Sequence, residues 1–150
     1  MKSLQKILPP VYLALGLITM FLLHNFLPLL IIIPGHYTNA GLPLILTGLF
    51  TTGLGAGAFR AADTPVKPFE RSTTLVTHGL FRFSRNPMYL GLVLILAGSA
   101  VFVGTLSPFF VIPVFVIIIQ EGYIKHEEAF LEEIFGEAYR AYRTRVRRWL

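Results

Sequence analysis

The sequence predicts an all-α integral membrane protein with four transmembrane helices, both termini in the cytoplasm and a C-terminal helix that leaves the bilayer. Hydrophobic residues make up 54% of the 150 residues and charged residues 14%, whereas a soluble domain carries about 25% charged residues. A soluble fold of this size could not bury so much apolar surface, because small domains bury a smaller share of their surface. We expect residues 1–150 to form one domain.

Four apolar stretches are long enough, or nearly so, to cross about 30 Å of hydrocarbon, which takes roughly 20 helical residues. They run from Leu8 to Ile33, Leu42 to Phe59, Pro87 to Val103 and Leu106 to Gln120. The first run is too long for a signal peptide, and further apolar segments follow it. The chain therefore divides into two helices (1–60), a cytoplasmic loop (61–86), a helical hairpin (87–120), and a cytoplasmic helix with a basic tail (121–150).

The basic residues indicate the orientation. All thirteen Lys and Arg residues lie in the N-terminus, in the segment Arg60–Asn86 or after Gln120, and the turns 34–40 and 104–105 contain none. Basic residues mark the cytoplasmic side of short loops, and four spans with both termini inside satisfy this rule. The positive charge then lies beside a membrane, so anionic lipid is the expected partner and nucleic acid is not.

Two polar segments meet at the cytoplasmic end of the predicted hairpin: residues 72–89, STTLVTHGLFRFSRNPMY, and residues 121–145, EGYIKHEEAFLEEIFGEAYRAYRTR. The second segment reads as a helix with an apolar stripe that includes Ile124 and Leu131 and that stops at Gly136. The segments should form a cup at the membrane surface. The chain contains no cysteine, which excludes a thiolate metal site and a cysteine nucleophile, and no other metal site is predicted.

Glu127 lies on or beside this apolar stripe, where a carboxylate is costly unless it meets a cation. Spacing leaves two explanations open: an ion pair with Arg82 or Arg85, or a cationic ligand. Small residues also suggest helix contacts, because they allow the backbones to approach closely. The pairs Gly53 with Gly57 and Gly91 with Gly98 are the candidates for such packing.

The string SRNPMYLG, preceded by LVTHGLFRF and followed by HEEAFLEEIFGEAYRAYRTRV, resembles the isoprenylcysteine carboxyl methyltransferase family and the related phosphatidylethanolamine N-methyltransferases. The resemblance spans roughly Thr73 to Val146. It implies S-adenosyl-L-methionine as the cofactor, bound at the cytoplasmic face between the start of the third helix and the helix that follows the membrane. Carried over residue by residue, the implied cofactor-binding residues are Thr73, Thr74, Leu75, Val76, Phe81, Asn86, Pro87, Met88, Tyr89, Glu127 and Glu128.

The chemistry of the cofactor fits these residue types. S-adenosyl-L-methionine presents an ammonium, a carboxylate, a cationic sulfonium and a flat adenine. Glu127 can offset the ammonium, and the rings of Phe81 and Tyr89 offer faces for the adenine or the sulfonium. In methyl transfer by direct displacement, the protein mainly supplies proximity and orientation and a site that excludes water.

The sequence departs from the family pattern at two positions. Asn86 stands where the family more often has histidine, and Tyr123 stands where carboxyl-methylating members carry an arginine that orients the acceptor carboxylate. Lys125, His126 and Arg145 are the candidate catalytic residues that could substitute, and His126 is the candidate base, because histidine exchanges a proton most readily near neutral pH. The acceptor is therefore predicted only as a lipid or another lipophilic molecule.

Two other functions remain open. An NADPH-dependent membrane reductase is possible, but its cofactor phosphates would favour arginines over the acidic cluster formed by Glu127, Glu128, Glu132 and Glu133. A non-catalytic membrane assembly protein that retains the fold is the other alternative, and the altered position at Tyr123 is its support. The sequence leaves the oligomeric state undetermined.

Overall fold

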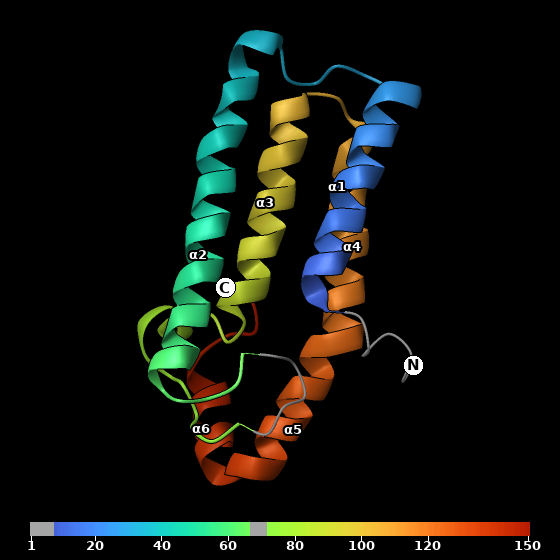
Figure 1. The fold of residues 1–150 in the computed structure, drawn as a ribbon. Coiled ribbons are helices and arrows are strands. Elements are labelled where there is room, and N and C mark those ends of the chain that lie inside the picture. Colours follow the sequence, from blue (N-terminus) through green and yellow to red (C-terminus); the bar gives the residue numbers. More distant parts are fainter. Residues whose placement is uncertain (1–7, 67–71) are drawn as a thin grey trace.

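The computed structural model describes residues 8–66 and 72–150, and the basic residues Lys2, Lys6, Lys67 and Arg71 lie outside these ranges. The described chain is all-helical, as predicted, and its only β pairing is an isolated bridge between Ile31 and Thr105. Figure 1 shows the α-helices, which are α1 (Pro9–Phe26), α2 (Gly41–Ala61), α3 (Pro87–Val103), α4 (Val111–Ile119), α5 (Lys125–Phe135) and α6 (Glu137–Arg145). Shorter helical turns are η2 (Gly35–Ala40), η3 (Gly79–Arg82), η4 (Ser107–Phe110) and η5 (Gln120–Ile124).

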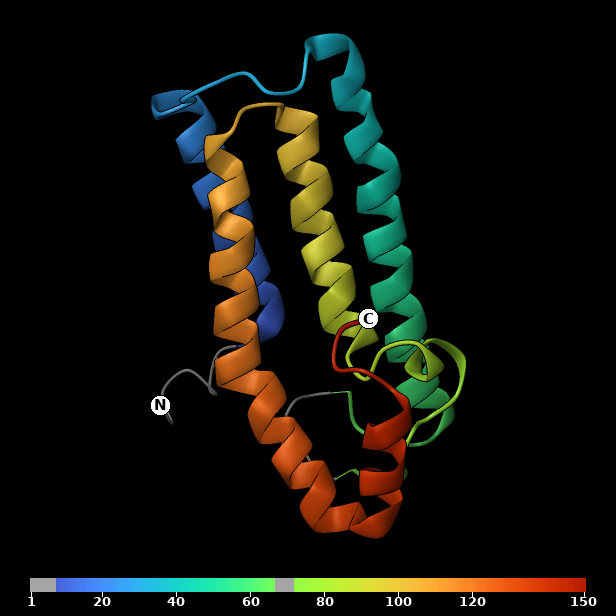
Figure 2. The ribbon, with the colours of Figure 1, turned by 180° about the vertical axis from the view of Figure 1, so that it is seen from behind.

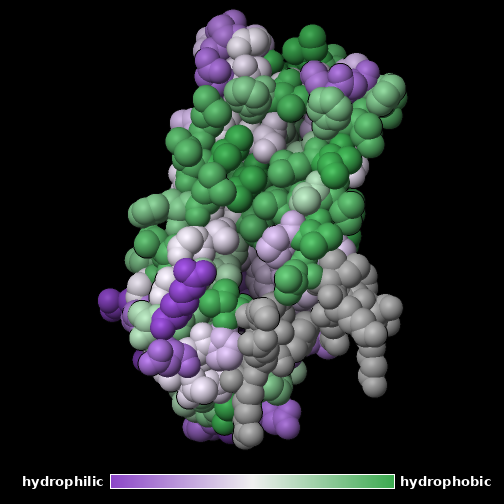
Figure 3. Space-filling view, in the orientation of Figure 1, coloured by the Kyte–Doolittle hydropathy of each residue, from purple (hydrophilic) through white to green (hydrophobic). Residues whose placement is uncertain are grey.

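Three described helices are long and apolar enough to cross a membrane: Pro9–Phe26 with 18 residues, Gly35–Ala61 with 27 and Ser107–Phe135 with 29. The apolar helix α3 has 17 residues, so it rises about 26 Å. Four spans therefore remain a prediction. Large apolar side chains such as Phe21 and Phe50 are exposed, and an apolar band crosses the middle of the surface (Figure 3). Such a surface suits a multi-pass membrane protein.

The first predicted span is shorter than expected. Its helix ends at Phe26, because Pro28 disfavours a helical conformation in the residue before it and Leu27 adopts a φ of −147°. The chain then passes beside the turn between α3 and α4, where Leu106 N–H donates to Leu30 O at 2.9 Å. Gly104 makes this turn with a φ of 80°. The two uncharged turns therefore lie together at one end of the molecule.

Helices α2 and α3 pack closely through glycines. A Cβ added to Gly48 would lie 2.5 Å from Gly91 O, and one added to Gly98 would lie 2.6 Å from Gly41 O. The predicted packing of Gly91 and Gly98 is confirmed. The predicted packing of Gly53 and Gly57 is wrong, because a Cβ at either position would meet open space. The α2 contact face is instead formed by glycines spaced seven apart, namely Gly41, Gly48 and Gly55.

The core lies between α3, α4 and α1, with Leu96 and Ile119 fully buried. Helix α4 continues through the wide turn η5 into α5. Charged residues begin at Glu121, so we place α5 beyond the apolar, membrane-spanning part of this long helix. Gly136 ends α5 as predicted, with a φ of 51°, and α6 turns back beside it (Figure 2). The tail after α6 then returns to the lower end of α3.

Candidate functional site

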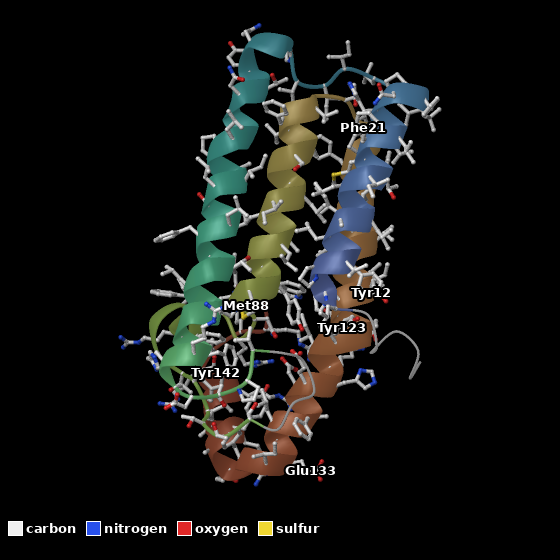
Figure 4. All side chains as sticks on the ribbon, viewed as in Figure 1. Tyr12, Phe21, Met88, Tyr123, Glu133 and Tyr142 are labelled. Carbon is white, nitrogen blue, oxygen red and sulfur yellow. The ribbon has the colours of Figure 1, made fainter. Side chains whose placement is uncertain are left out.

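A cavity of about 300 Å³ lies at the charged end of the molecule. Its walls come from the lower ends of α2 and α3, the loop before η3, and the facing sides of α5 and α6, with Pro9 and Pro10 of α1 at its rim. Figure 4 shows this end of the molecule, where Met88 and Tyr142 approach from different elements. The volume is at the lower end of the range for small-molecule sites.

The two predicted motif blocks meet in this cavity. Ten of the eleven residues implied as cofactor-binding line it: Thr74, Leu75, Val76, Phe81, Asn86, Pro87, Met88, Tyr89, Glu127 and Glu128. Thr73 does not line it. Its hydroxyl donates to Asp63 O at 2.8 Å and its N–H donates to the hydroxyl of Thr64 at 2.9 Å, so Thr73 fastens the loop to the end of α2.

Glu127 presents its carboxyl to the cavity. The hydroxyl of Tyr89 donates to Glu127 Oε1 at 2.8 Å, and no ion pair joins Glu127 to another described residue. Burial raises the pKa of Glu127 to about 7, the hydrogen bond from Tyr89 opposes this rise, and the negative charge of Glu128 adds to it. A half-buried carboxyl of this kind gains most from a cationic ligand.

The arginines that could have paired with Glu127 belong to its neighbour. Arg85 and Arg148 each donate to Glu128 at 2.7 Å, and the Glu128 side chain is only 8% exposed. Burial by itself would raise the pKa of Glu128, but the hydrogen bonds from Arg148 and Arg85 hold it below its usual value. The alternative that Arg82 or Arg85 neutralises Glu127 is therefore wrong: Arg85 pairs with Glu128, one residue later, and no ion pair joins Arg82 to Glu127 among the described residues.

The segment after α6 does not line the cavity, but it holds the start of α3 beside it. Backbone N–H of Arg85 donates to Arg147 O at 3.0 Å, and Asn86 Nδ2 donates to Arg148 O at 3.0 Å. Trp149 Nε1 donates to Gln120 Oε1 at 3.0 Å. The sequence analysis missed this role, because Arg148 stands in a run of arginines that resembles a solvated, membrane-facing tail. No local pattern distinguishes it from its neighbours.

The three predicted catalytic residues do not line the cavity. Lys125 is exposed and pairs with Glu121 at 2.7 Å. Arg145 is exposed and donates to Ala141 O at 3.1 Å. His126 lies on α5 beside Glu127, with its Nδ1 buried and without a partner among the described residues. Their catalytic roles stay predictions.

Tyr123 is fully buried in the core. Its ring lies 5.9 Å from that of Tyr12 and 6.4 Å from that of Tyr89, measured between ring centroids, and Figure 4 shows Tyr12 close to it. The position that carries an arginine in carboxyl-methylating relatives is therefore an aromatic core position in this chain, outside the lining of the cavity.

Several cavity residues lay outside the predicted set. The ring of Phe59 of α2 lies edge-on to that of Phe81, with 5.2 Å between the ring centroids. The hydroxyl of Tyr142 of α6 donates to Phe81 O at 2.7 Å. Tyr139 and Tyr142 both line the cavity. Their spacing places them on one face of a helix, a pattern that by itself predicts packing of the tail and no role in the site. That packing is present, and the same rings also form a wall.

The comparisons with known proteins concern the family of the chain. A family model described as phospholipid methyltransferase matches residues 37–138, which include the Asn86–Tyr89 block and Glu127. The chain belongs to the phospholipid methyltransferase family. An uncharacterized protein of Haemophilus influenzae is 40% identical over 63 residues, which are 42% of this chain and all of that protein. The family resemblance is confirmed, and membership implies a membrane methyltransferase.

Proposed function

We propose that this protein is an S-adenosyl-L-methionine-dependent methyltransferase that acts on a lipid or a small lipophilic acceptor at the cytoplasmic face of the membrane. The single observation that carries the proposal is the carboxyl of Glu127. It lies in the cavity formed by the two family blocks, it accepts a hydrogen bond from Tyr89, and no described cation offsets it. We propose four spans with both termini in the cytoplasm, because basic residues mark the cytoplasmic side of a membrane protein. This topology places the cavity on that side.

The residues present fit the cofactor. Glu127 would accept the ammonium, since a charge-assisted hydrogen bond is stronger than a neutral one. The rings of Phe81 and Tyr89 would hold the adenine or lie against the sulfonium. When bound, S-adenosyl-L-methionine supplies an activated methyl group. We assign Glu128 to organising the wall through its two arginines, in place of direct contact with the ammonium.

The apolar walls of the cavity would contribute to methyl transfer by binding the acceptor and excluding water. Met88 and Leu92 of α3 and Thr52 of α2 extend the cavity toward the membrane-spanning part of the helices. A lipophilic acceptor held against these side chains would reach the charged end of the cavity without leaving the bilayer. The same walls exclude water from the reacting atoms, and the helix ends hold the two reactants in a fixed orientation.

The proposal is tested by calorimetric titration of the purified protein with S-adenosylhomocysteine. The wild-type protein should bind, and Glu127→Gln should bind at least about tenfold more weakly, because the amide cannot offset the ammonium charge. Glu133→Gln is the matched control: Glu133 lies on the same helix, is exposed (Figure 4) and should leave the affinity unchanged.

No heat of binding for the wild-type protein at millimolar S-adenosylhomocysteine would contradict the proposal. Binding of NADPH in its place would support the reductase alternative. The acceptor would be identified by mass spectrometry of membrane lipids and small lipophilic molecules after labelling with an isotopic methyl donor, with and without the protein.

A further inference from the structure

The residues after α6 hold the start of α3 through their backbone. Four hydrogen bonds cross between these segments: Arg85 N–H to Arg147 O at 3.0 Å, Arg85 Nη1 to Val146 O at 2.9 Å, Asn86 Nδ2 to Arg148 O at 3.0 Å and Ser84 Oγ to Arg148 O at 3.3 Å. Ser84 Oγ in turn accepts the N–H of Asn86 at 3.1 Å. The turn that leads into the Asn86–Tyr89 block therefore rests on the segment 146–148.

The same segment supplies Arg148, one of the two arginines that pair with Glu128. Arg148 reaches both oxygens of Glu128, with Nη2 at 2.7 Å from Oε2 and Nε at 3.1 Å from Oε1, and Arg85 reaches Oε1 at 2.7 Å. Glu128 is buried, so its negative charge would be costly without these two arginines. The cluster joins three separate segments: the turn before α3, helix α5 and the tail.

We propose that the tail residues 146–149 are a positioning element of the cofactor site and that Arg148 is its central positioning residue. Arg148 ties the Asn86–Tyr89 block to α5, and it offsets the charge of Glu128, so that Glu127 is the carboxylate offered to the ligand. This inference rests on the proposed function, because it concerns how the same site is prepared for a cationic ligand.

The charges around Glu127 make this role measurable. Three titratable groups interact with Glu127: Tyr89 from α3, Tyr123 from η5 and Glu128 on its own helix. Arg85 from the turn before α3 and Tyr139 from α6 line the same cavity. Glu128 is the negative group that opposes ionisation of Glu127. Loss of Arg148 leaves that negative charge less compensated, so Glu127 ionises only at a higher pH.

The test measures S-adenosylhomocysteine affinity between pH 6 and 8.5 for the wild-type protein, Arg148→Ala, Arg148→Lys and Arg147→Ala, together with their thermal unfolding midpoints. Arg147 is the matched control, since alanine there removes the same net charge from an exposed side chain and keeps the backbone carbonyl that accepts from Arg85. We expect Arg148→Ala to weaken binding about tenfold or more at pH 7, because it breaks a buried pair, and to recover part of this loss at pH 8.5. Arg148→Lys should fall between, since it keeps the charge but not the two-oxygen contact.

The outcomes separate the inference from the proposed function. If the wild-type protein does not bind S-adenosylhomocysteine, the proposed function fails and the inference fails with it. If the wild-type protein binds and Arg148→Ala behaves like Arg147→Ala, the inference alone is overturned. A loss of the same factor at every pH, paralleled by a lower unfolding midpoint, would also overturn it, because a purely structural role predicts that result. Should Arg148→Ala not fold, the affinity and pH profile of Arg148→Lys decide the question.

Discussion

Glu127 and Glu128 are adjacent in the chain, yet they face different surroundings. Consecutive residues on a helix point in directions about 100° apart. Glu128 therefore meets Arg85 and Arg148, while Glu127 meets the hydroxyl of Tyr89 and the cavity. One carboxyl is neutralised inside the protein, and the other is left to a ligand. We propose that the two carboxyls have different roles, with Glu128 holding the structure and Glu127 binding the ligand.

The pKa of Glu127 predicts how ligand binding depends on pH. Burial raises this pKa to about 7, so the carboxyl is largely protonated at pH 6 and largely ionised at pH 8. A cationic ammonium binds the ionised form. We therefore expect S-adenosylhomocysteine to bind about tenfold more tightly at pH 8 than at pH 6, as measured by calorimetry at both pH values. Glu127→Gln should lack this dependence, and an affinity that falls with rising pH in the wild-type protein would argue against the assignment.

At the scale of the elements, α2 and α3 form the closest helix pair near the site, and Met88 of α3 also contacts Gly55 of α2 closely. A Cβ added to Gly91 would lie 2.6 Å from Gly48 O and would also crowd Thr52. The α2–α3 contact thus sets the position from which the Asn86–Tyr89 block starts.

This contact predicts a difference between two glycine substitutions. Gly91→Ala should destabilise the protein by about 1–3 kcal/mol, because the added methyl group forces the helices apart. Gly53→Ala, on the same helix pair but facing open space, should be neutral or slightly stabilising, since alanine favours the helix. Thermal unfolding in detergent would measure both, and equal effects of the two substitutions would contradict the observed packing.

The elements also show where sequence reasoning is sufficient. The bounds of α3 and the stop at Gly136 were predicted from a proline, a glycine and an apolar run, because these signals act locally. The choice of glycines on α2 was wrong because several glycines share that helix, and only the partner helix selects a face. Arg148 was missed for the same reason, since it lies in the tail and its partner Glu128 lies 20 residues earlier, in α5.

At the scale of the whole molecule, the charged residues all lie in the segments that the predicted four-span topology places on one side of the membrane. No Asp, Glu, Lys or Arg occurs in residues 7–59 or 86–120, and the cavity lies beside the charged segments. The proposed insertion, with this end in the cytoplasm, would place the cavity on the side where a soluble methyl donor is available and would leave the apolar band facing lipid.

The orientation can be measured with single cysteines, because the natural chain contains none. Asn39→Cys lies in the uncharged turn η2, and Thr144→Cys lies at the exposed end of α6. A membrane-impermeant thiol reagent applied to intact cells should label Asn39→Cys and should label Thr144→Cys only after the cells are permeabilised. Labelling of Thr144→Cys in intact cells would reverse the proposed orientation.

The central claim is that the half-buried carboxyl of Glu127 accepts the ammonium of the methyl donor. The most direct measurement is an experimental structure of the protein with S-adenosylhomocysteine. We predict that the ligand's amino nitrogen lies within hydrogen-bond distance of Glu127, about 2.7–3.2 Å, with the adenine beside Phe81 or Tyr89. A ligand bound elsewhere, or bound in this cavity with Glu127 more than a hydrogen bond away from the ammonium, would contradict the claim.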